Sequence, residues 1–262
     1  MILFRTVRFF KYILLARHCM GHGIHSPFVF DLVKRVFRKK TDHDIIYAIE
    51  KIRMKLINDK QRILVQDLGS GNNLYKTESR RISDIARYSP VTKKYGRLLS
   101  NLASEFGKPM IIELGTSFGI STMYMAASCN DTIIYTIEGC PGIAKIAKQN
   151  FDEAGLTNIK LIEGSFDEVL PDLLTIGVSP GMVFIDGNHR KAPLLKYFRQ
   201  IAEISGSNTV IIIDDINYSK EMAEAWKEIK LHMKVSVSIE TGRMGVIFFR
   251  EGINHKDYII RY

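Results

Sequence analysis

The chain has 262 residues, of which 46% are hydrophobic and 25% charged, which is ample for a buried core and ordinary for a soluble protein. Its three cysteines show no CxxC spacing, which argues against a zinc knuckle or a disulfide framework and favours a reducing, cytoplasmic setting. No apolar run approaches the roughly 20 residues that span a bilayer. The apolar opening stretch is interrupted by Arg5, Arg8 and Lys11, so it is not typical of a signal peptide.

The net charge of +9 is carried entirely by the first quarter of the chain. Residues 1–62 hold 14 Lys and Arg against 5 Asp and Glu, whereas residues 63–262 hold 23 of each. A basic segment with aromatic residues can lie on an anionic membrane, and peripheral contact through residues 1–20 is one interpretation. We favour the other, in which the segment docks onto its own catalytic domain with its charges in water.

The first 60 residues predict helices. Residues 28–40 and 42–57 have amphipathic spacing, and the sequence GHGIHSPF ends the helix that precedes them. The histidines in and before this break, His18, His22 and His25, have a spacing that could hold a metal ion. The glycines and the proline around them favour a lid over the acceptor pocket instead.

After residue 110, short apolar runs alternate with helical ones, which is typical of a parallel sheet wound on both faces. Residues 235–241 and 245–250 predict an antiparallel hairpin at one sheet edge. The expected fold is α/β, with a Rossmann-like, doubly wound, mostly parallel seven-stranded sheet, the C-terminal hairpin and a helical N-terminal extension. We expect residues 1–87 to form the extension and its connector, and residues 88–262 to form the catalytic domain.

Two glycine loops compete for the role of a cofactor-binding turn. Residues 62–73, RILVQDLGSGNN, and residues 110–122, MIIELGTSFGIST, each predict an apolar strand that ends in an acid and runs into glycines. Such a turn needs a helix directly after it and a second strand with an acid at its tip about 20 residues on. Only the second loop meets both conditions. We therefore expect residues 62–73 to be a short strand and turn that join the extension to the core.

The composition of the second loop favours S-adenosylmethionine over NAD. Ser117 stands where the dinucleotide fingerprint G-x-G-x-x-G has its middle glycine, which lets the backbone approach a pyrophosphate. Glu113 beside the loop would repel a pyrophosphate and suits a cation, and S-adenosylmethionine carries an ammonium group, a sulfonium and no phosphate. Glu138, at the next strand tip, is placed to accept hydrogen bonds from both ribose hydroxyls.

Five segments in order resemble the class I S-adenosylmethionine-dependent methyltransferases, in the branch of the catechol and caffeoyl-CoA O-methyltransferases. They are IIELGTSFGIST, YTIEGCP, LIEGSFDEVLPDL, MVFIDGNHRKAPLLKYF and VIIIDDINYS, and the resemblance covers residues 88–250. Any one segment is weak, but the order of the five makes the resemblance specific. The first 60 or so residues, including HGIHSPF, resemble an extension of some bacterial methyltransferases.

The resemblance implies a set of cofactor-binding residues. The loop after the first strand would bind the methionine end, and residues 164–166 would line the adenine. The alternative is that these are ordinary turns, with Phe166 in the core and Glu138 at a solvated strand end. The predicted set is Glu113, Gly115, Thr116, Ser117, Gly119, Ser121, Glu138, Gly139, Gly164, Ser165, Phe166 and Asp186.

Three carboxylates end the fourth and fifth predicted strands, namely Asp186, Asp214 and Asp215. They would repel one another unless a cation or a proton intervenes. In the metal-dependent enzymes that the chain resembles, a divalent ion binds there, and oxygen ligands suit Mg²⁺ or Ca²⁺. Those enzymes usually have Asn where this chain has Asp215. We weigh a metal site evenly against contacts of these side chains with cofactor or backbone alone.

His189, three residues after Asp186, is the candidate general base for an acceptor hydroxyl, because an unperturbed imidazole has a pKa near ~6.5. The alternative is a histidine at a helix start that contacts cofactor or solvent. Asp186 and His189 are therefore the predicted catalytic residues.

The sequence predicts an S-adenosylmethionine-dependent methyltransferase that O-methylates a small or medium-sized acceptor. A second interpretation is a catalytically silent S-adenosylmethionine-binding protein. The basic extension suggests a nucleic-acid enzyme as a third, but DGNH stands after the fourth strand where amino-methylating enzymes of that kind have an N/D-P-P-Y/F tetrad. The sequence therefore argues against nucleic acid as a partner, and a homo-oligomer is left open.

Overall fold

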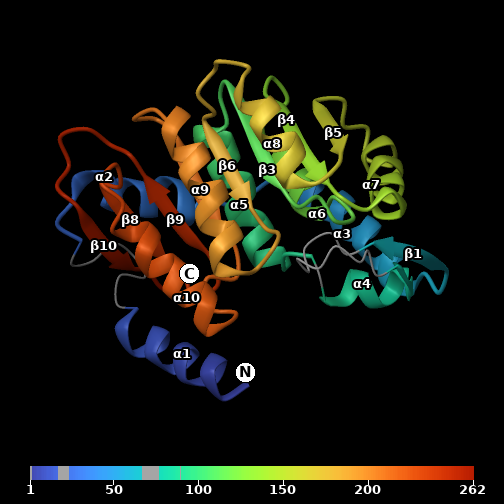
Figure 1. Cartoon of the computed structure of the whole chain (residues 1–262), viewed down its shortest axis with the longest axis horizontal. Coiled ribbons are helices and arrows are strands. Elements are labelled where there is room, and N and C mark those ends of the chain that lie inside the picture. The colour runs from blue at the N-terminus through green and yellow to red at the C-terminus, as the bar shows by residue number, and fades with distance from the viewer. Residues whose placement is uncertain (1, 17–23, 67–76, 89) are drawn as a thin grey trace. The chain divides into compact units, whose positions relative to one another are not determined.

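A computed structural model describes residues 2–16, 24–66, 77–88 and 90–262 (Figure 1). The chain divides into two compact units. Residues 40–176 form one unit, and residues 1–39 form the other together with residues 177–262.

The unit of residues 40–176 contains three parallel strands in the order β3-β4-β5. All five residues of β3 are buried, as is typical of a strand covered on both faces, and Glu113 is the one charged residue among them. A helix follows each strand, so the predicted strand-helix alternation is confirmed here. The bounds are β3 Met110–Leu114, α6 Ile120–Ala126, β4 Ile133–Glu138, α7 Pro141–Glu153, β5 Ile159–Glu163 and α8 Phe166–Leu174.

The same unit begins with helices and a separate two-stranded hairpin. The expected strand in residues 62–73 is confirmed as β1, but its partner β2, a polar strand, was not predicted. Helix α5, which carries the buried Leu98, Leu99 and Leu102, was also missed. The bounds are α3 His43–Asn58, β1 Arg62–Gln66, β2 Thr77–Arg81, α4 Ile82–Tyr88 and α5 Lys93–Phe106.

The other unit contains five strands in the order β10-β8-β9-β7-β6. Strands β6 and β7 are parallel and fully buried, and β9 runs antiparallel to both β7 and β8. Helices α9 and α10 follow β6 and β7. The bounds are β6 Met182–Ile185, α9 Lys191–Ile204, β7 Val210–Ile213, α10 Lys220–Lys230, β8 Val237–Glu240, β9 Gly245–Phe248 and β10 Lys256–Ile259.

The α/β fold with a mostly parallel sheet and a C-terminal antiparallel hairpin is confirmed. The expected edge is wrong, because the hairpin does not end the sheet. An eighth central strand, β10, pairs parallel to β8 and covers its free side. Its short sequence, KDYI, is half polar, so it lacks the apolar run by which the other strands were found.

The predicted N-terminal helices are present as α1 Ile2–Leu15, α2 Pro27–Leu32 and α3, and the π-helical turn η1 Val33–Phe37 extends α2. Helix α1 contacts the loop before α10 (Figure 1). The expectation that α1 docks with its charges in water is wrong for two of them. Arg5 donates to the backbone oxygen of Tyr218, and Arg8 donates to the side chain of Asn217.

Within the described ranges, we find no helix whose length and apolar content would let it cross a bilayer.

Candidate functional site

The loop between β3 and α6 has a backbone that only particular residues can adopt. Gly115, Ser117 and Gly119 have φ angles of 106°, 48° and 80°. A Cβ on Gly119 would lie 2.2 Å from the ring of Phe151, so this position requires glycine for space as well as for φ. The loop is tied to β4, because the amides of Gly115 and Thr116 donate to the backbone oxygen of Ile137.

Glu113 lies beneath this loop with no exposed surface. Its carboxylate accepts hydrogen bonds from Ser121 at 2.6 Å, from Thr136 at 2.7 Å and from Thr122. Burial raises the pKa of Glu113 to about 7. The three hydroxyl donors act to lower this pKa, and the charge of Glu138 acts with burial to raise it. Glu113 therefore fixes the start of α6 to β4 and can change its protonation state near neutral pH.

Glu138 is the acid at the end of β4, and its side chain joins two loops. Oε2 accepts from the amide of Ser117 at 2.8 Å, and Oε1 accepts from the amide of Cys140 at 3.0 Å. Burial raises the pKa of Glu138, and the backbone donors oppose that rise. Each carboxylate oxygen can accept a second hydrogen bond, so Glu138 retains capacity for a ligand with two hydroxyls.

The loop after β5 completes this edge of the sheet. The amide of Gly164 donates to the backbone oxygen of Glu138 at 3.0 Å. Ser165 caps α8 in a reciprocal pair with Glu168, and this fixes the first helical residue, the partly exposed Phe166.

Eleven of the twelve predicted cofactor residues thus lie at the carboxyl ends of three adjacent strands, where open α/β sheets bind ligands. The structure divides them into two groups. Glu113, Thr116 and Ser121 are buried supports, as is Gly119. The partly exposed members are Gly115, Ser117, Glu138, Gly139, Gly164, Ser165 and Phe166.

Asp186, Asp214 and Asp215 lie in the other unit, after β6 and β7. Asp214 has no exposed surface, and Nε of Arg243 lies 2.8 and 3.0 Å from its two oxygens. The same nitrogen lies 3.3 Å from Oδ1 of Asp215, and Asp186 is also within electrostatic reach of Arg243. The cation that lies between Asp214 and Asp215 is therefore a guanidinium.

The electrostatics of this cluster follow from its burial. Burial raises the pKa of Asp214, the charge of Arg243 lowers it, and the neighbouring Asp215 raises it. Burial acts to lower the pKa of Arg243, but the carboxylates outweigh it, so the net shift is upward. Arg243 thus stays charged at all relevant pH values.

His189 follows Asp186 in the loop before α9. Its Nε2 lies 3.8 Å from Oδ1 of Asp186, and its ring lies 5.7 Å from the ring of Tyr218, centroid to centroid. Tyr218 is also the residue that Arg5 of α1 covers, with its guanidinium carbon 3.8 Å from the ring centroid. The neighbourhood of His189 is therefore partly built by α1.

Arg243 is the functional residue that the sequence reasoning missed. It sits in the turn between β8 and β9, far along the chain from the acids it pairs with. A signal existed, because the three acids were expected to need a cation.

Several expectations concern residues outside the described ranges. His18 and His22 lie there, so the metal and lid interpretations of that segment are not addressed, and neither is the turn of residues 67–73. Among the residues that are described, no group of three or more His, Cys, Asp and Glu is arranged to hold a metal ion.

Comparisons with known proteins find relatives among the methyltransferases. Residues 112–216 match a family described as a methyltransferase domain. The catechol O-methyltransferase of Niastella koreensis is 35% identical over 130 residues, which is 48% of this chain and 58% of that protein. The chain thus spans somewhat more than half the length of this relative.

Solved structures share the fold. The O-methyltransferase of Bacillus cereus, in complex with S-adenosylhomocysteine, aligns over 84% of this chain and 97% of that one, with a TM-score of 0.54 and 18% identity. TomG of Streptomyces achromogenes, an O-methyltransferase in complex with S-adenosylmethionine, aligns over 85% and 95%, with a TM-score of 0.56 and 20% identity. The Rossmann-like architecture is therefore confirmed.

Proposed function

Since residues 112–216 match a family described as a methyltransferase domain, we propose that this protein transfers a methyl group from S-adenosylmethionine to an oxygen of a small or medium-sized acceptor. The observation that carries the proposal is the pair of loops joined by Glu138, whose carboxylate lies at the strand tip with backbone donors on both oxygens. This arrangement has no counterpart to the phosphate-binding glycine that NAD requires, because Ser117 takes that position.

Each loop has a proposed part in holding the cofactor. The methionine end lies along residues 115–119, with Glu113 and Ser121 acting from beneath the loop rather than on the ligand. Glu138 accepts the ribose hydroxyls, with Gly139 beside it. Residues 164–166 line the adenine, because Phe166 is fixed by the Ser165 cap and remains partly exposed. Asp186 is retained as a cofactor or acceptor contact.

The acidic cluster does not fit a divalent ion as the structure stands. A ligand for Mg²⁺ needs free carboxylate oxygens, but both oxygens of Asp214 are engaged by Arg243, which also pairs with Asp215. We therefore derive no step through a metal and propose that Arg243 takes the place of a metal ion beside Asp214 and Asp215.

Methyl transfer is an in-line displacement in which positioning supplies much of the rate. We propose that His189 accepts the proton of the acceptor hydroxyl as its oxygen forms a bond to the methyl carbon. The bond from that carbon to the sulfonium sulfur breaks at the same time, and S-adenosylhomocysteine leaves. Asp186, 3.8 Å from the imidazole, stabilises the charged ring that results. Arg243 cannot take this proton, because its guanidinium stays charged.

The remaining expectations are carried as proposals. We propose an extension of residues 1–87 followed by a catalytic domain of residues 88–262. We also retain the proposal of a homo-oligomer. A cytoplasmic setting is supported by Cys129 and Cys140, which are both free thiols. The sequence DGNH at residues 186–189 continues to disfavour a nucleic-acid acceptor.

Two measurements test the proposed function. Calorimetry should show micromolar affinity for S-adenosylhomocysteine and no comparable affinity for NAD, and the reverse order would overturn the cofactor assignment. With labelled S-adenosylmethionine, a panel of catechols should then accept label in the wild type and not in His189→Ala. Tight cofactor binding without transfer to any oxygen acceptor would favour the silent binding protein.

A further inference from the structure

Helix α1 docks through a polar face. Besides the contacts of Arg5 and Arg8, the hydroxyl of Tyr12 donates to the backbone oxygen of Ile260 at 3.0 Å and accepts from the amide of Tyr262 at 3.0 Å. The ring of Tyr12 also lies against Gly242, where an added Cβ would come within 2.9 Å of it. Three residues spaced at helical intervals thus fix one side of α1 to the unit of residues 1–39 and 177–262.

The opposite side of α1 is apolar and exposed. Val7, Phe10 and Leu14 are 57%, 60% and 74% exposed. Since successive residues of an α-helix are rotated by about 100°, these three lie opposite the docked side chains. Phe9 and Ile13 flank them and are also exposed, whereas Leu15 lies beyond Lys11 in a groove with Arg8. We call Val7, Phe9, Phe10, Ile13 and Leu14 the outer face of α1.

This orientation reverses what a docked helix normally does. A surface helix of a globular protein turns its apolar stripe to the core and its charges to water, whereas here two arginines face the protein. Five large apolar side chains between residues 7 and 14 lie next to one another on this side of the helix, and exposed patches of that kind mark interaction sites. The sequence alone placed these residues correctly on the helix but could not tell which side docks.

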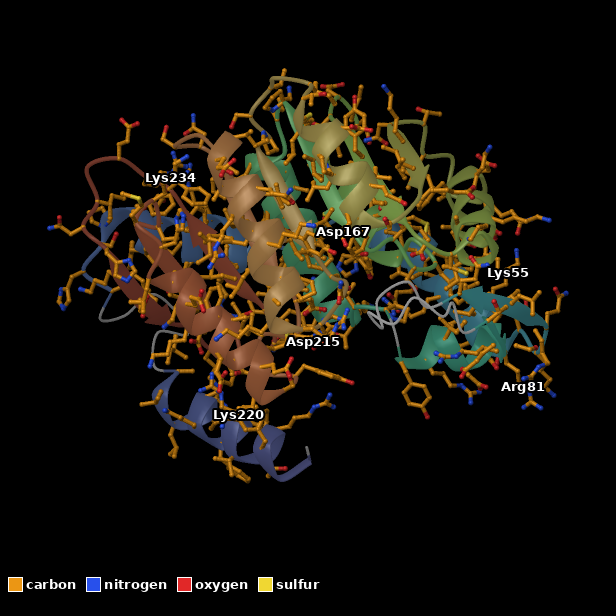
Figure 2. All side chains as sticks on the ribbon, in the orientation of Figure 1. Lys55, Arg81, Asp167, Asp215, Lys220 and Lys234 are labelled. Carbon is orange, nitrogen blue, oxygen red and sulfur yellow. The ribbon has the colours of Figure 1, made fainter. Side chains whose placement is uncertain are left out.

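The charges beside the outer face select its partner. Lys11 is exposed on α1, and Lys227 of α10 lines the same groove as Lys11, Arg8 and Leu15. Neither lysine forms an ion pair with another described residue. Figure 2 marks Lys220 at the start of α10, next to the loop that holds α1. A second copy of this chain would bring the same cations together, whereas an anionic surface would complement them.

We propose that the outer face of α1 binds the surface of an anionic membrane. The five apolar side chains of the outer face enter the boundary between headgroups and acyl chains, and Lys11 and Lys227 lie among the headgroups. The partner is a lipid surface rather than a protein groove, because the face is flanked by cations. The binding does not depend on the proposed methyl transfer.

The experiment is sedimentation of the full-length protein with vesicles of phosphatidylcholine alone or with phosphatidylglycerol. The test variant is Phe10→Ser with Leu14→Ser. The matched control is Tyr47→Ser with Met54→Ser, which removes two exposed apolar side chains seven residues apart on α3. Thermal unfolding of all three proteins shows whether each is folded, and calorimetry with S-adenosylhomocysteine gives a readout independent of lipid.

We expect the wild type and the α3 control to pellet with the phosphatidylglycerol vesicles and to be released by high salt, because salt screens the lysine contribution. The α1 variant should lose at least about tenfold in partitioning, since interfacial binding scales with buried apolar area, while its cofactor affinity is unchanged. Failure of the folded wild type to pellet would overturn the proposal, as would equal pelleting of the two variants. A wild-type dimer that the α1 variant breaks, without vesicle binding, would assign the outer face to self-association.

Discussion

The ends of β3 and β7 hold two buried carboxylates in different ways. Glu113 and Asp214 have no exposed surface, and a residue with positive φ follows shortly after each, Ser117 at 48° and Asp215 at 52°. Glu113 is held by three neutral hydroxyls, whereas Asp214 is held by a charged guanidinium. Hydroxyls can donate to a carboxylate and accept from a carboxylic acid, so Glu113 can titrate. Arg243 can only donate hydrogen bonds, so its contribution favours the charged form of Asp214 and opposes the effect of burial.

The largest expected effect on stability comes from removing the charge of Arg243 beside Asp214. Arg243→Met should leave Asp214 buried and unpaired, and the free energy of unfolding should fall by about 3 kcal/mol at pH 8, the lower end for a buried pair because Arg243 is partly exposed. The loss should be smaller at pH 5, because Asp214 can then take up a proton. Urea unfolding at the two pH values measures both effects.

The double variant Arg243→Met with Asp214→Asn is the control for that experiment. It removes the unpaired charge and should recover most of the lost stability. Equal destabilisation of the single and double variants would mean that packing of the arginine side chain, rather than its charge, holds the loop.

The titration of Glu113 gives the next effect. The pKa is raised from 4.5 to about 7 in the folded protein, so the folded state binds the proton more tightly than the unfolded state does. The stabilisation is fully present below pH 4.5 and is lost as the pH rises through about 7. Between pH 5 and pH 7.5 the free energy of unfolding of the wild type should fall by about 2 kcal/mol more than that of Glu113→Gln.

Urea unfolding of the wild type, Glu113→Gln and Glu163→Gln at both pH values makes this comparison. Glu163 is an exposed glutamate at the end of β5, so its variant should follow the wild type. If Glu113→Gln shows the same pH dependence as the wild type, another group is responsible and the hydroxyls hold a permanently charged Glu113.

A smaller effect is expected at Glu138, because it acts on binding rather than on the core. Glu138→Ala should weaken the affinity for S-adenosylhomocysteine by about 1.5 kcal/mol, or roughly tenfold, the scale of hydrogen bonds to a charged group. The control Glu163→Ala changes the residue paired with Glu138 in the β4-β5 register.

Asp67→Ala, in the loop rejected as a cofactor site, should leave the affinity for S-adenosylhomocysteine within about twofold. Loss of binding in Asp67→Ala alone would mean that the wrong loop was chosen.

The sequence predicted what is local in the chain. The strand, the glycines and the acid of each candidate cofactor loop lie within a few residues of one another, so periodicity and loop composition were sufficient to place Gly115, Gly119 and Glu138 at the strand ends. It did not predict pairings between distant positions. Arg243 lies 29 residues after Asp214, and the docked face of α1 depends on residues more than 200 positions away. Neither set of contacts produces a repeating pattern in the sequence, because each contact is made by a single side chain.

The smallest effect should come from removing divalent ions, since Arg243 already neutralises the acids that would bind one. Once an acceptor is found, turnover in EDTA should equal turnover in Mg²⁺, and Mg²⁺ should not raise the Tm of the wild type, because a ligand stabilises only the state that binds it. Arg243→Met frees the oxygens of Asp214 and Asp215, so Mg²⁺ should raise the Tm of that variant, and the double variant with Asp214→Asn should lose the effect. If EDTA instead abolishes turnover of the wild type and Mg²⁺ restores it, Arg243 must leave the acids during the reaction, and His189 does not act alone as the base.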